Sequence, residues 1–316
     1  FDVEICKGSE TILNGTGNGE FLWSTGETTQ SISALTSGVY TVNVITAQGC
    51  AGDSDPISVT VNANPTPTIS PVGPTTFCDG GSVTLTTGSF ASYSWSTGET
   101  TQNITVTTSG TYTVTVTDGN SCEGTSAPIT ITVDDLPEPT VTAGGPTTFC
   151  DGDNVVLTAS SAVSYLWSTG ATTQSITVST AGSFTVTVTD GNGCEGTSDP
   201  VVTTVNENPT PTITPDGPII FCDGDSVVLT SSAADAYLWS TGATTQSITV
   251  FATGTFTVTV TDANACVGTS APLTVTVNNN PTPTISASGP LEFCDGDSVI
   301  LTSSTATSYL WSTGAT

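Results

Sequence analysis

Cysteine is the residue type whose spacing most directly predicts chemistry in this sequence. Nine cysteines alternate in steps of 44 and 28 residues along a chain of 316 residues: Cys6, Cys50, Cys78, Cys122, Cys150, Cys194, Cys222, Cys266 and Cys294. Thiolate zinc sites use closely spaced cysteine pairs or histidines, and the sequence has neither. Regularly paired cysteines in a repetitive chain therefore predict disulfides and an oxidising compartment.

Short acidic turns are the second group that could bind a ligand. Asp223 with Asp225 and Asp151 with Asp153 could offer carboxylates to calcium, which takes about six to eight oxygen ligands. The corresponding turn near the N-terminus reads Lys7-Gly8-Ser9, so the acidic pair is not a constant feature. Turn formation explains these residues better. We expect no cofactor, with calcium as the minor alternative.

The charged residues argue against catalysis and against anionic partners. The chain has 28 acidic residues, one basic residue and no histidine, for a formal net charge of −27. Without histidine there is no Ser-His-Asp triad, and one cation cannot neutralise nucleic-acid phosphates or an anionic lipid surface. No stretch approaches the roughly 18 apolar residues that span a bilayer. We expect a protein that is not an enzyme, binds no nucleic acid and inserts no part of this segment into a membrane.

Aromatic residues follow a repeat of 72 residues. The tryptophans are Trp23, Trp95, Trp167, Trp239 and Trp311, and a second aromatic position holds Tyr40, Tyr112, Phe184 and Phe256. A tryptophan on the third strand of a small β-sandwich fills the core, so we predict core positions for both sets. An exposed tryptophan ladder that stacks on sugars is the alternative. Two of the four second-position residues lack a hydroxyl, so a hydrogen bond there is not expected to be general.

Within one repeat, short segments alternate between apolar and polar residues. Thr255–Thr261 reads TFTVTVT and Leu273–Val277 reads LTVTV, and a period of two marks half-buried strands. Turn residues such as Asp223-Gly224-Asp225 separate the segments. Six or seven such strands in about 70 residues predict a small immunoglobulin-like sandwich. The fold class is therefore all-β, a tandem array of immunoglobulin-like modules stacked head to tail.

The period also predicts module boundaries. The modules comprise residues 1–62, 63–134, 135–206 and 207–278, followed by a partial module at residues 279–316. The first copy lacks its opening strand and the last stops after its tryptophan strand, so we interpret the sequence as a window on a longer polypeptide.

Two disulfide schemes follow from this arrangement. The first pairs cysteines within a module: Cys6–Cys50, Cys78–Cys122, Cys150–Cys194 and Cys222–Cys266. The second joins successive modules: Cys6–Cys122, Cys78–Cys194 and Cys150–Cys266, with Cys50, Cys222 and Cys294 finding partners outside the segment. The two cysteines of one sandwich lie at opposite ends, about 25 Å apart. A disulfide needs α-carbons within about 7 Å, so we favour the scheme between modules.

One motif string resembles a known repeat. Tyr93-Ser-Trp95-Ser-Thr-Gly98, followed by the segment from Gly110 to Cys122, is similar to the SprB-type repeat and related PKD-like modules of giant surface adhesins of gliding Bacteroidota. The resemblance implies export through the type IX system, display at the cell surface, and contact with the secretion and motility machinery. The Gly-Gly-x-Pro-Pro-Tyr run of that family is absent, and Ser160–Leu166 reads SSAVSYL instead.

These features together predict a structural function. We expect an extracellular stalk or filament at the cell surface, whose partners are further repeats of the same chain and, through lateral self-association, other stalks. One alternative is an array that binds carbohydrate or calcium. Another is the accessory stalk of a secreted enzyme.

Overall fold

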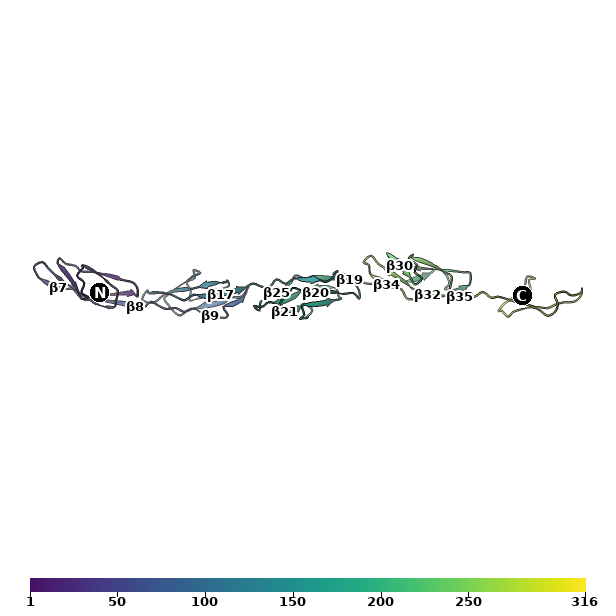
Figure 1. The fold of residues 1–316 in the computed structure, drawn as a ribbon, viewed down its shortest axis with the longest axis horizontal. Coiled ribbons are helices and arrows are strands. Elements are labelled where there is room, and N and C mark those ends of the chain that lie inside the picture. The colour runs from purple at the N-terminus through teal and green to yellow at the C-terminus, as the bar shows by residue number, and fades with distance from the viewer. The chain divides into compact units, whose positions relative to one another are not determined.

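The regular structure of this protein consists of β-strands. A computed structural model describes residues 1–316, and its ordered elements are the strands β1 to β37 joined by turns and loops (Figure 1). Two compact units make up the chain. The first contains Phe1–Thr142, Thr158–Gln174 and Phe184–Pro200, and the second contains Ala143–Leu157, Ser175–Ser183 and Val201–Thr316.

The first sequence copy has eight strands in the first unit. They are β1 (Asp2–Cys6), β2 (Thr11–Asn14), β3 (Glu20–Trp23), β4 (Ser31–Ala34), β5 (Gly38–Tyr40), β6 (Val42–Ile45), β7 (Ala51–Asp53) and β8 (Ile57–Asn62). Their sheet orders are β1-β8-β5, β3-β6-β7 and the two-stranded β2-β4. Strand β1 runs parallel to β8, whereas the other pairs are antiparallel.

The second copy, also in the first unit, has nine strands. They are β9 (Ser70–Val72), β10 (Thr76–Cys78), β11 (Val83–Thr86), β12 (Ser92–Trp95), β13 (Asn103–Val106), β14 (Gly110–Tyr112), β15 (Val114–Thr117), β16 (Glu123–Thr125) and β17 (Ile129–Asp134). The sheet orders are β13-β11-β9, β12-β15-β16 and β10-β17-β14. Strand β9 therefore extends the sheet of β11, a position that has no counterpart in the first copy.

The core of the second copy explains the alternating sequence pattern. Val83 and Leu85 on β11 pack with Trp95 on β12 and with Val114 and Val116 on β15, and each is at most 2 % exposed. Threonines at the intervening positions of β15 are only half-buried. Residues from two facing sheets thus share one apolar layer, as in an immunoglobulin-like sandwich.

Strands of the third copy lie in both units. They are β18 (Val141–Ala143), β19 (Thr148–Cys150), β20 (Val155–Ala159), β21 (Ser164–Trp167), β22 (Ser175–Val178), β23 (Gly182–Phe184), β24 (Val186–Thr189), β25 (Glu195–Thr197) and β26 (Val201–Asn206). Sheet β21-β24-β25 belongs to the first unit, and β19 runs parallel to β26 in the second.

The second unit also contains the fourth copy and the remaining residues. The strands are β27 (Ile213–Pro215), β28 (Ile220–Cys222), β29 (Val227–Ser231), β30 (Ala236–Trp239), β31 (Ser247–Val250), β32 (Gly254–Phe256), β33 (Val258–Thr261), β34 (Val267–Thr269), β35 (Leu273–Asn278), β36 (Ile285–Ala287) and β37 (Leu301–Ser303). Strands β27 to β35 repeat the sheet orders of the second copy, and β36 pairs only with β37. The fold is all-β, a tandem series of immunoglobulin-like sandwiches, and this prediction is confirmed.

Two details of the strand prediction need correction. The expected strand Thr255–Thr261 is interrupted at Thr257, whose carbonyl accepts a hydrogen bond from Ser240 N at 2.9 Å. The short strand β34 was not expected, because Val267-Gly268-Thr269 carries too little alternation to stand out. Each copy from the second to the fourth therefore has nine strands rather than six or seven.

Two residues predicted for the core, Trp311 and Phe256, are only half-buried. Trp23, Trp95, Trp167 and Trp239 are 2–5 % exposed, but Trp311 is only half-buried, and its segment forms no strand. Phe256 is also intermediate, and it lines a shallow hollow beside Phe251, which is 64 % exposed.

Candidate functional site

The most regular feature of the structure is a set of three disulfides. Cys6 is bonded to Cys122, Cys78 to Cys194 and Cys150 to Cys266, with α-carbon separations of 5.4, 5.6 and 5.5 Å. Each bond spans 116 residues and joins one sequence copy to the next. Cys50, Cys222 and Cys294 are free and exposed.

The within-module pairs are not formed, and the strand register gives the reason. Cys6–Cys50, Cys78–Cys122, Cys150–Cys194 and Cys222–Cys266 are all unbonded. Cys78 pairs with Asp134 at the last residue of β17, whereas Cys122 lies beside the short strand β16, ahead of the start of β17. The six residues of β17 separate the two cysteines by roughly 20 Å at 3.3 Å per residue.

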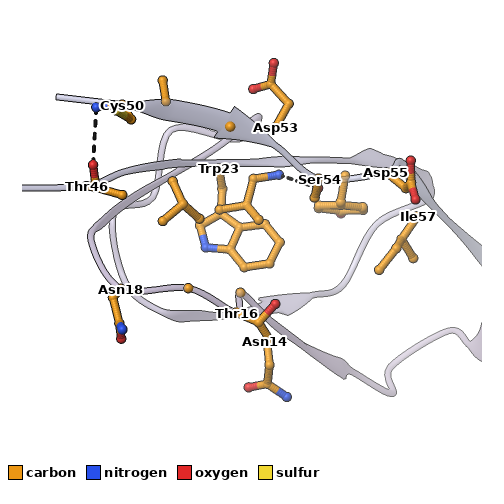
Figure 2. Close-up of a pocket in the computed structure, with 17 residues that line it drawn as sticks. Asn14, Thr16, Asn18, Trp23, Thr46, Cys50, Asp53, Ser54, Asp55 and Ile57 are labelled. Atoms are coloured by element: carbon orange, nitrogen blue, oxygen red, sulfur yellow. Dashed lines mark hydrogen bonds between the residues drawn. The ribbon is translucent and has the colours of Figure 1, made fainter. Parts of the chain in front are cut away.

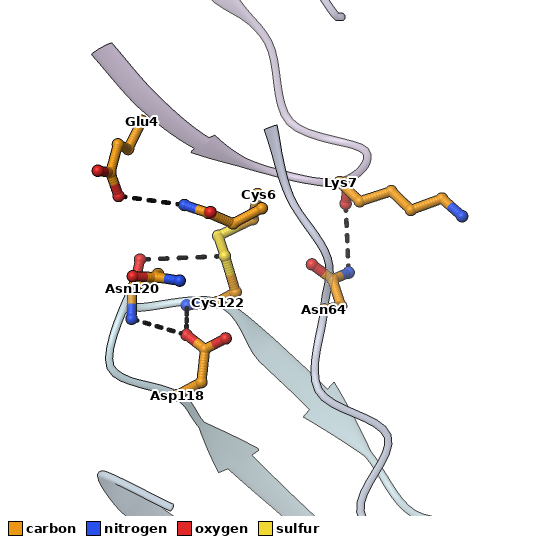
Figure 3. Close-up of a disulfide and its surroundings, with 8 residues drawn as sticks. Glu4, Cys6, Lys7, Asn64, Asp118, Asn120 and Cys122 are labelled. Atoms are coloured by element: carbon orange, nitrogen blue, oxygen red, sulfur yellow. Dashed lines mark hydrogen bonds between the residues drawn. A yellow bond between two sulfur atoms is a disulfide. The ribbon is translucent and has the colours of Figure 1, made fainter. Parts of the chain in front are cut away.

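An aspartate holds the second cysteine of each bond in place. The Asp118 carboxylate accepts hydrogen bonds from Asn120 N and Cys122 N, both at 2.9 Å (Figure 3). Asp190 and Asp262 make the same pair of bonds in the next two copies. The acidic side chain therefore shapes a turn that presents the cysteine, which is the local reason for the Asp-x-x-x-Cys spacing.

An asparagine in the linker ties it to the turn beyond the first cysteine. Asn64 Nδ2 donates to the Lys7 carbonyl at 3.2 Å (Figure 3), and Asn208 and Asn280 donate to the carbonyls of Asp151 and Asp223 at 2.9 and 2.7 Å. The remaining linker has Leu136 at this position. Its side chain is 45 % exposed and has no amide group that could donate a hydrogen bond.

Leu136→Asn is therefore expected to stabilise the linker after β17. The new side-chain amide reaches the Asp79 carbonyl as Asn64 reaches the Lys7 carbonyl. This hydrogen bond should raise the free energy of local opening by up to about 1 kcal/mol. Hydrogen exchange of the amides around Asp79 should slow in this variant. Leu136→Ala removes the same exposed side chain without adding a donor, so equal protection in both variants would contradict the explanation.

The linker prolines pack against a glycine of the following sandwich. A Cβ built on Gly124 would lie 1.7 Å from the Pro65 carbonyl oxygen, and on Gly196 and Gly268 it would lie 1.8 and 1.7 Å from those of Pro137 and Pro209. Only glycine permits this approach. The linker also covers a serine two residues further on: Ser126, Ser198 and Ser270 are 6–7 % exposed, and each accepts a backbone hydrogen bond from a buried valine.

The first copy has a groove where this linker lies in the others. Its volume is about 550 Å³, and it lies between the Asn14–Asn18 segment and the Cys50–Ile57 segment, with Trp23 between them (Figure 2). Gly52 has nothing within 4 Å of a built Cβ, and Ser54, the counterpart of Ser126, is exposed. The Asp53 carboxylate points away from Trp23 (Figure 2), so the groove presents mainly backbone and small side chains.

The acidic turn residues and the tryptophans, which the sequence offered as possible ligand-binding residues, take part in turns and in core packing. Asp225 N bonds to the Cys222 carbonyl at 3.1 Å within a turn, and the Asp223 carbonyl accepts the Asn280 amide. No three His, Cys, Asp or Glu side chains converge as a metal site would require. The indole nitrogens of Trp23, Trp95, Trp167 and Trp239 each donate to a threonine carbonyl at 2.8 Å, so these rings form no exposed ladder.

The second aromatic position uses its hydroxyl where one is present. Tyr40 and Tyr112 donate to the carbonyls of Thr36 and Thr108 at 2.9 and 2.8 Å. In the third copy the residue is Phe184, and the Thr203 hydroxyl donates instead to the Thr180 carbonyl at 2.7 Å. The Thr180 carbonyl thus accepts its hydrogen bond from a residue on a different strand, β26. The sequence did not predict this replacement.

Comparison with known proteins identifies no relative by sequence, because no family model and no curated protein matches. Solved structures with several immunoglobulin domains match in part. Dscam1 isoform 6.9, N-terminal four Ig domains, is 11 % identical with a TM-score of 0.22, covering 88 % of this chain and 97 % of that one. An ICAM-5 ectodomain fragment is 12 % identical with a TM-score of 0.35, covering 86 % and 93 %. Murine CEACAM1b is 15 % identical with a TM-score of 0.24, covering 44 % and 100 %. The fold assignment depends on the strand topology and not on these likenesses.

The disulfides indicate the kind of cellular compartment in which the protein is found. Three disulfides in one chain fit an oxidising environment, because cytosolic thiols are kept reduced. None of the structure's elements is a helix with the length and apolar character that crossing a bilayer requires.

Proposed function

We propose that this chain is a non-enzymatic structural array, a stalk or filament segment of an extracellular adhesin at the cell surface. The observation that carries the proposal is the disulfide bonding of each sequence copy to the next with a constant spacing of 116 residues. Such bonds restrain the junctions between modules, whereas a disulfide inside a module would stabilise that module alone.

Further contacts at the junctions support a mechanical role. Proline at Pro65 and Pro67 restricts the linker backbone, and Asn64 ties the linker to the preceding turn. Like charge on successive modules, from a net charge of −27, opposes collapse of the array. Gliding motility and type IX secretion belong to this proposal through the resemblance of the Tyr93–Gly98 motif and the segment from Gly110 to Cys122. Lateral self-association of the stalks is also part of the proposal.

Reduction of the disulfides tests the proposal. Solution scattering of the chain with dithiothreitol should report more flexible junctions, while far-ultraviolet circular dichroism stays unchanged because the sandwich cores do not depend on the bonds. The double variant Cys78→Ser/Cys194→Ser should give the same effect at a single junction. A scattering profile that reduction leaves unchanged would contradict the proposal.

The alternatives predict different results with the same material. A carbohydrate-binding array should give signals on a glycan array, and a calcium-binding array should gain thermal stability when calcium is added. We expect neither result. An accessory stalk of a secreted enzyme shares the mechanics of the proposed array and differs only in what it carries.

A further inference from the structure

Strand β31 (Ser247–Val250) of the fourth copy forms an open sheet edge. It pairs with β29 on one side only, at the end of the order β27-β29-β31. Native proteins usually protect such an edge with lysine, proline, a bulge or a charged side chain. The strand reads SITV, which contains no charge and no proline, and Phe251 follows it directly with 64 % of its surface exposed. A segment with this composition favours pairing with a further strand.

Part of the β31 backbone points away from β29. Ser231 N donates to the Gln246 carbonyl at 3.0 Å, and bonded positions alternate with unbonded ones along an antiparallel pair. The backbone groups of Ser247 and Thr249 therefore face the open edge. The Ser247 carbonyl already accepts the Thr245 hydroxyl at 2.7 Å. Thr249 thus presents one backbone donor and one backbone acceptor to an incoming strand.

The exposure of Phe251 is a property of its position in the sandwich. At the same position of the other copies, Leu35, Thr107 and Ser179 are all exposed, although a complete copy follows each of them. The third copy has a strand of identical sequence, β22, but Ser179 follows that strand in place of phenylalanine. The fourth copy therefore combines the shared open edge with an aromatic side chain that the third copy lacks.

A shallow hollow runs along the same edge. Its volume is about 590 Å³, and its lining extends from Thr241 and Ala243 along β31 to Phe251. None of the lining residues is charged, although the chain has a net charge of −27. A second molecule of this chain can therefore contact the hollow without bringing like charges together, which most other acidic surfaces of the chain would not allow.

We propose that β31 pairs antiparallel with β31 of a second molecule of this chain, about a two-fold axis at Thr249. The Thr249 N–H of each molecule donates to the Thr249 carbonyl of the other. Ser247 and Phe251 lie at equal distances along the strand on either side of Thr249, so the edge is complementary to itself. Each Phe251 ring then lies opposite Ser247 of the other molecule and fills its hollow. This surface deepens the proposed function, because the inference rests on the lateral self-association of stalks.

Sedimentation velocity of the full chain tests the proposal. Cys50, Cys222 and Cys294 are replaced by serine, so that free thiols form no crosslinks and the three disulfides remain. We expect a monomer–dimer equilibrium that sodium chloride shifts toward the dimer, because salt screens the repulsion between two acidic chains. Phe251→Ser, which reproduces the third-copy sequence, should raise the dissociation constant at least about tenfold. A chain that stays monomeric at high concentration and high salt would overturn this inference. The disulfide-restrained stalk would be unaffected, because scattering tests it on single chains.

Two proline variants identify the strand that pairs. Thr249→Pro removes the N–H that the dimer uses and keeps the bonds to β29, so it should also raise the dissociation constant at least about tenfold. Thr177→Pro is the matched control at the same position of β22, and it should leave the dissociation constant unchanged. Hydrogen exchange in the concentrated unsubstituted strands should slow at Thr249 N and not at Thr177 N. Equal effects of the two proline variants, or a dimer insensitive to Phe251→Ser, would refute pairing at β31.

Discussion

Trp95→Ala is expected to lower the free energy of unfolding of its module by about 3–5 kcal/mol. Trp95 is 2 % exposed and packs with Leu85 and Val114, so its removal leaves a large cavity between the two sheets. The variant also leaves the Thr101 carbonyl without its indole donor. Hydrogen exchange of the β15 amides measures the effect, because these amides open only when the sandwich unfolds.

The last tryptophan of the chain is the matched control. Trp311→Ala changes the same residue type after a similar local sequence, but Trp311 is half-buried and its segment forms no strand. Replacing Trp311 should therefore change the free energy of opening, measured by hydrogen exchange, by less than about 1 kcal/mol. Similar losses in the two variants would show that burial between the sheets is not what makes Trp95 important.

Gly124→Ala is expected to destabilise the second copy by about 3 kcal/mol. The new Cβ would lie 1.7 Å from the Pro65 carbonyl oxygen, so the linker must move off β16. Ser126 and Pro67, which are both buried at this contact, would then be exposed to solvent. Faster hydrogen exchange in β9 and β16 should report the loss of this packing.

The corresponding substitution in the first copy, Gly52→Ala, should raise the stability and not lower it. Gly52→Ala meets no atom within 4 Å, and alanine is more favourable than glycine in a strand by roughly 0.5–1 kcal/mol. Thermal unfolding of the two variants therefore gives a direct comparison at equivalent positions. A loss of stability in Gly52→Ala as large as in Gly124→Ala would rule out the linker contact as the cause.

The strand pattern and the spacing of the cysteines could be interpreted from the sequence. Alternation such as that of Thr255–Thr261 depends on neighbouring residues along one strand, which a sequence displays directly. Even so, the break at Thr257 was missed, because it depends on the hydrogen bond from Ser240, which follows β30. The exchange of the Tyr112 hydroxyl for that of Thr203 in the third copy was missed for the same reason.

The contacts of the linker were also beyond sequence reasoning. Pro65, Gly124 and Ser126 recur with the period, but nothing in their spacing shows that a glycine and a proline carbonyl meet across a junction. A signal was present, because Pro65, Pro137 and Pro209 precede Gly124, Gly196 and Gly268 by the same number of residues. Its meaning needed the coordinates, because the two residues are adjacent only after the sandwich has formed.

The sequence by itself determined the 72-residue period, the all-β class and the chemistry available to the chain, because composition and local alternation are properties of the unfolded polymer as well. Tertiary structure alone decided which residues of the linker and the following sandwich are in contact. The contact of Gly124 with the Pro65 carbonyl depends on the path that the linker takes over the folded sandwich, and no local pattern encodes that contact.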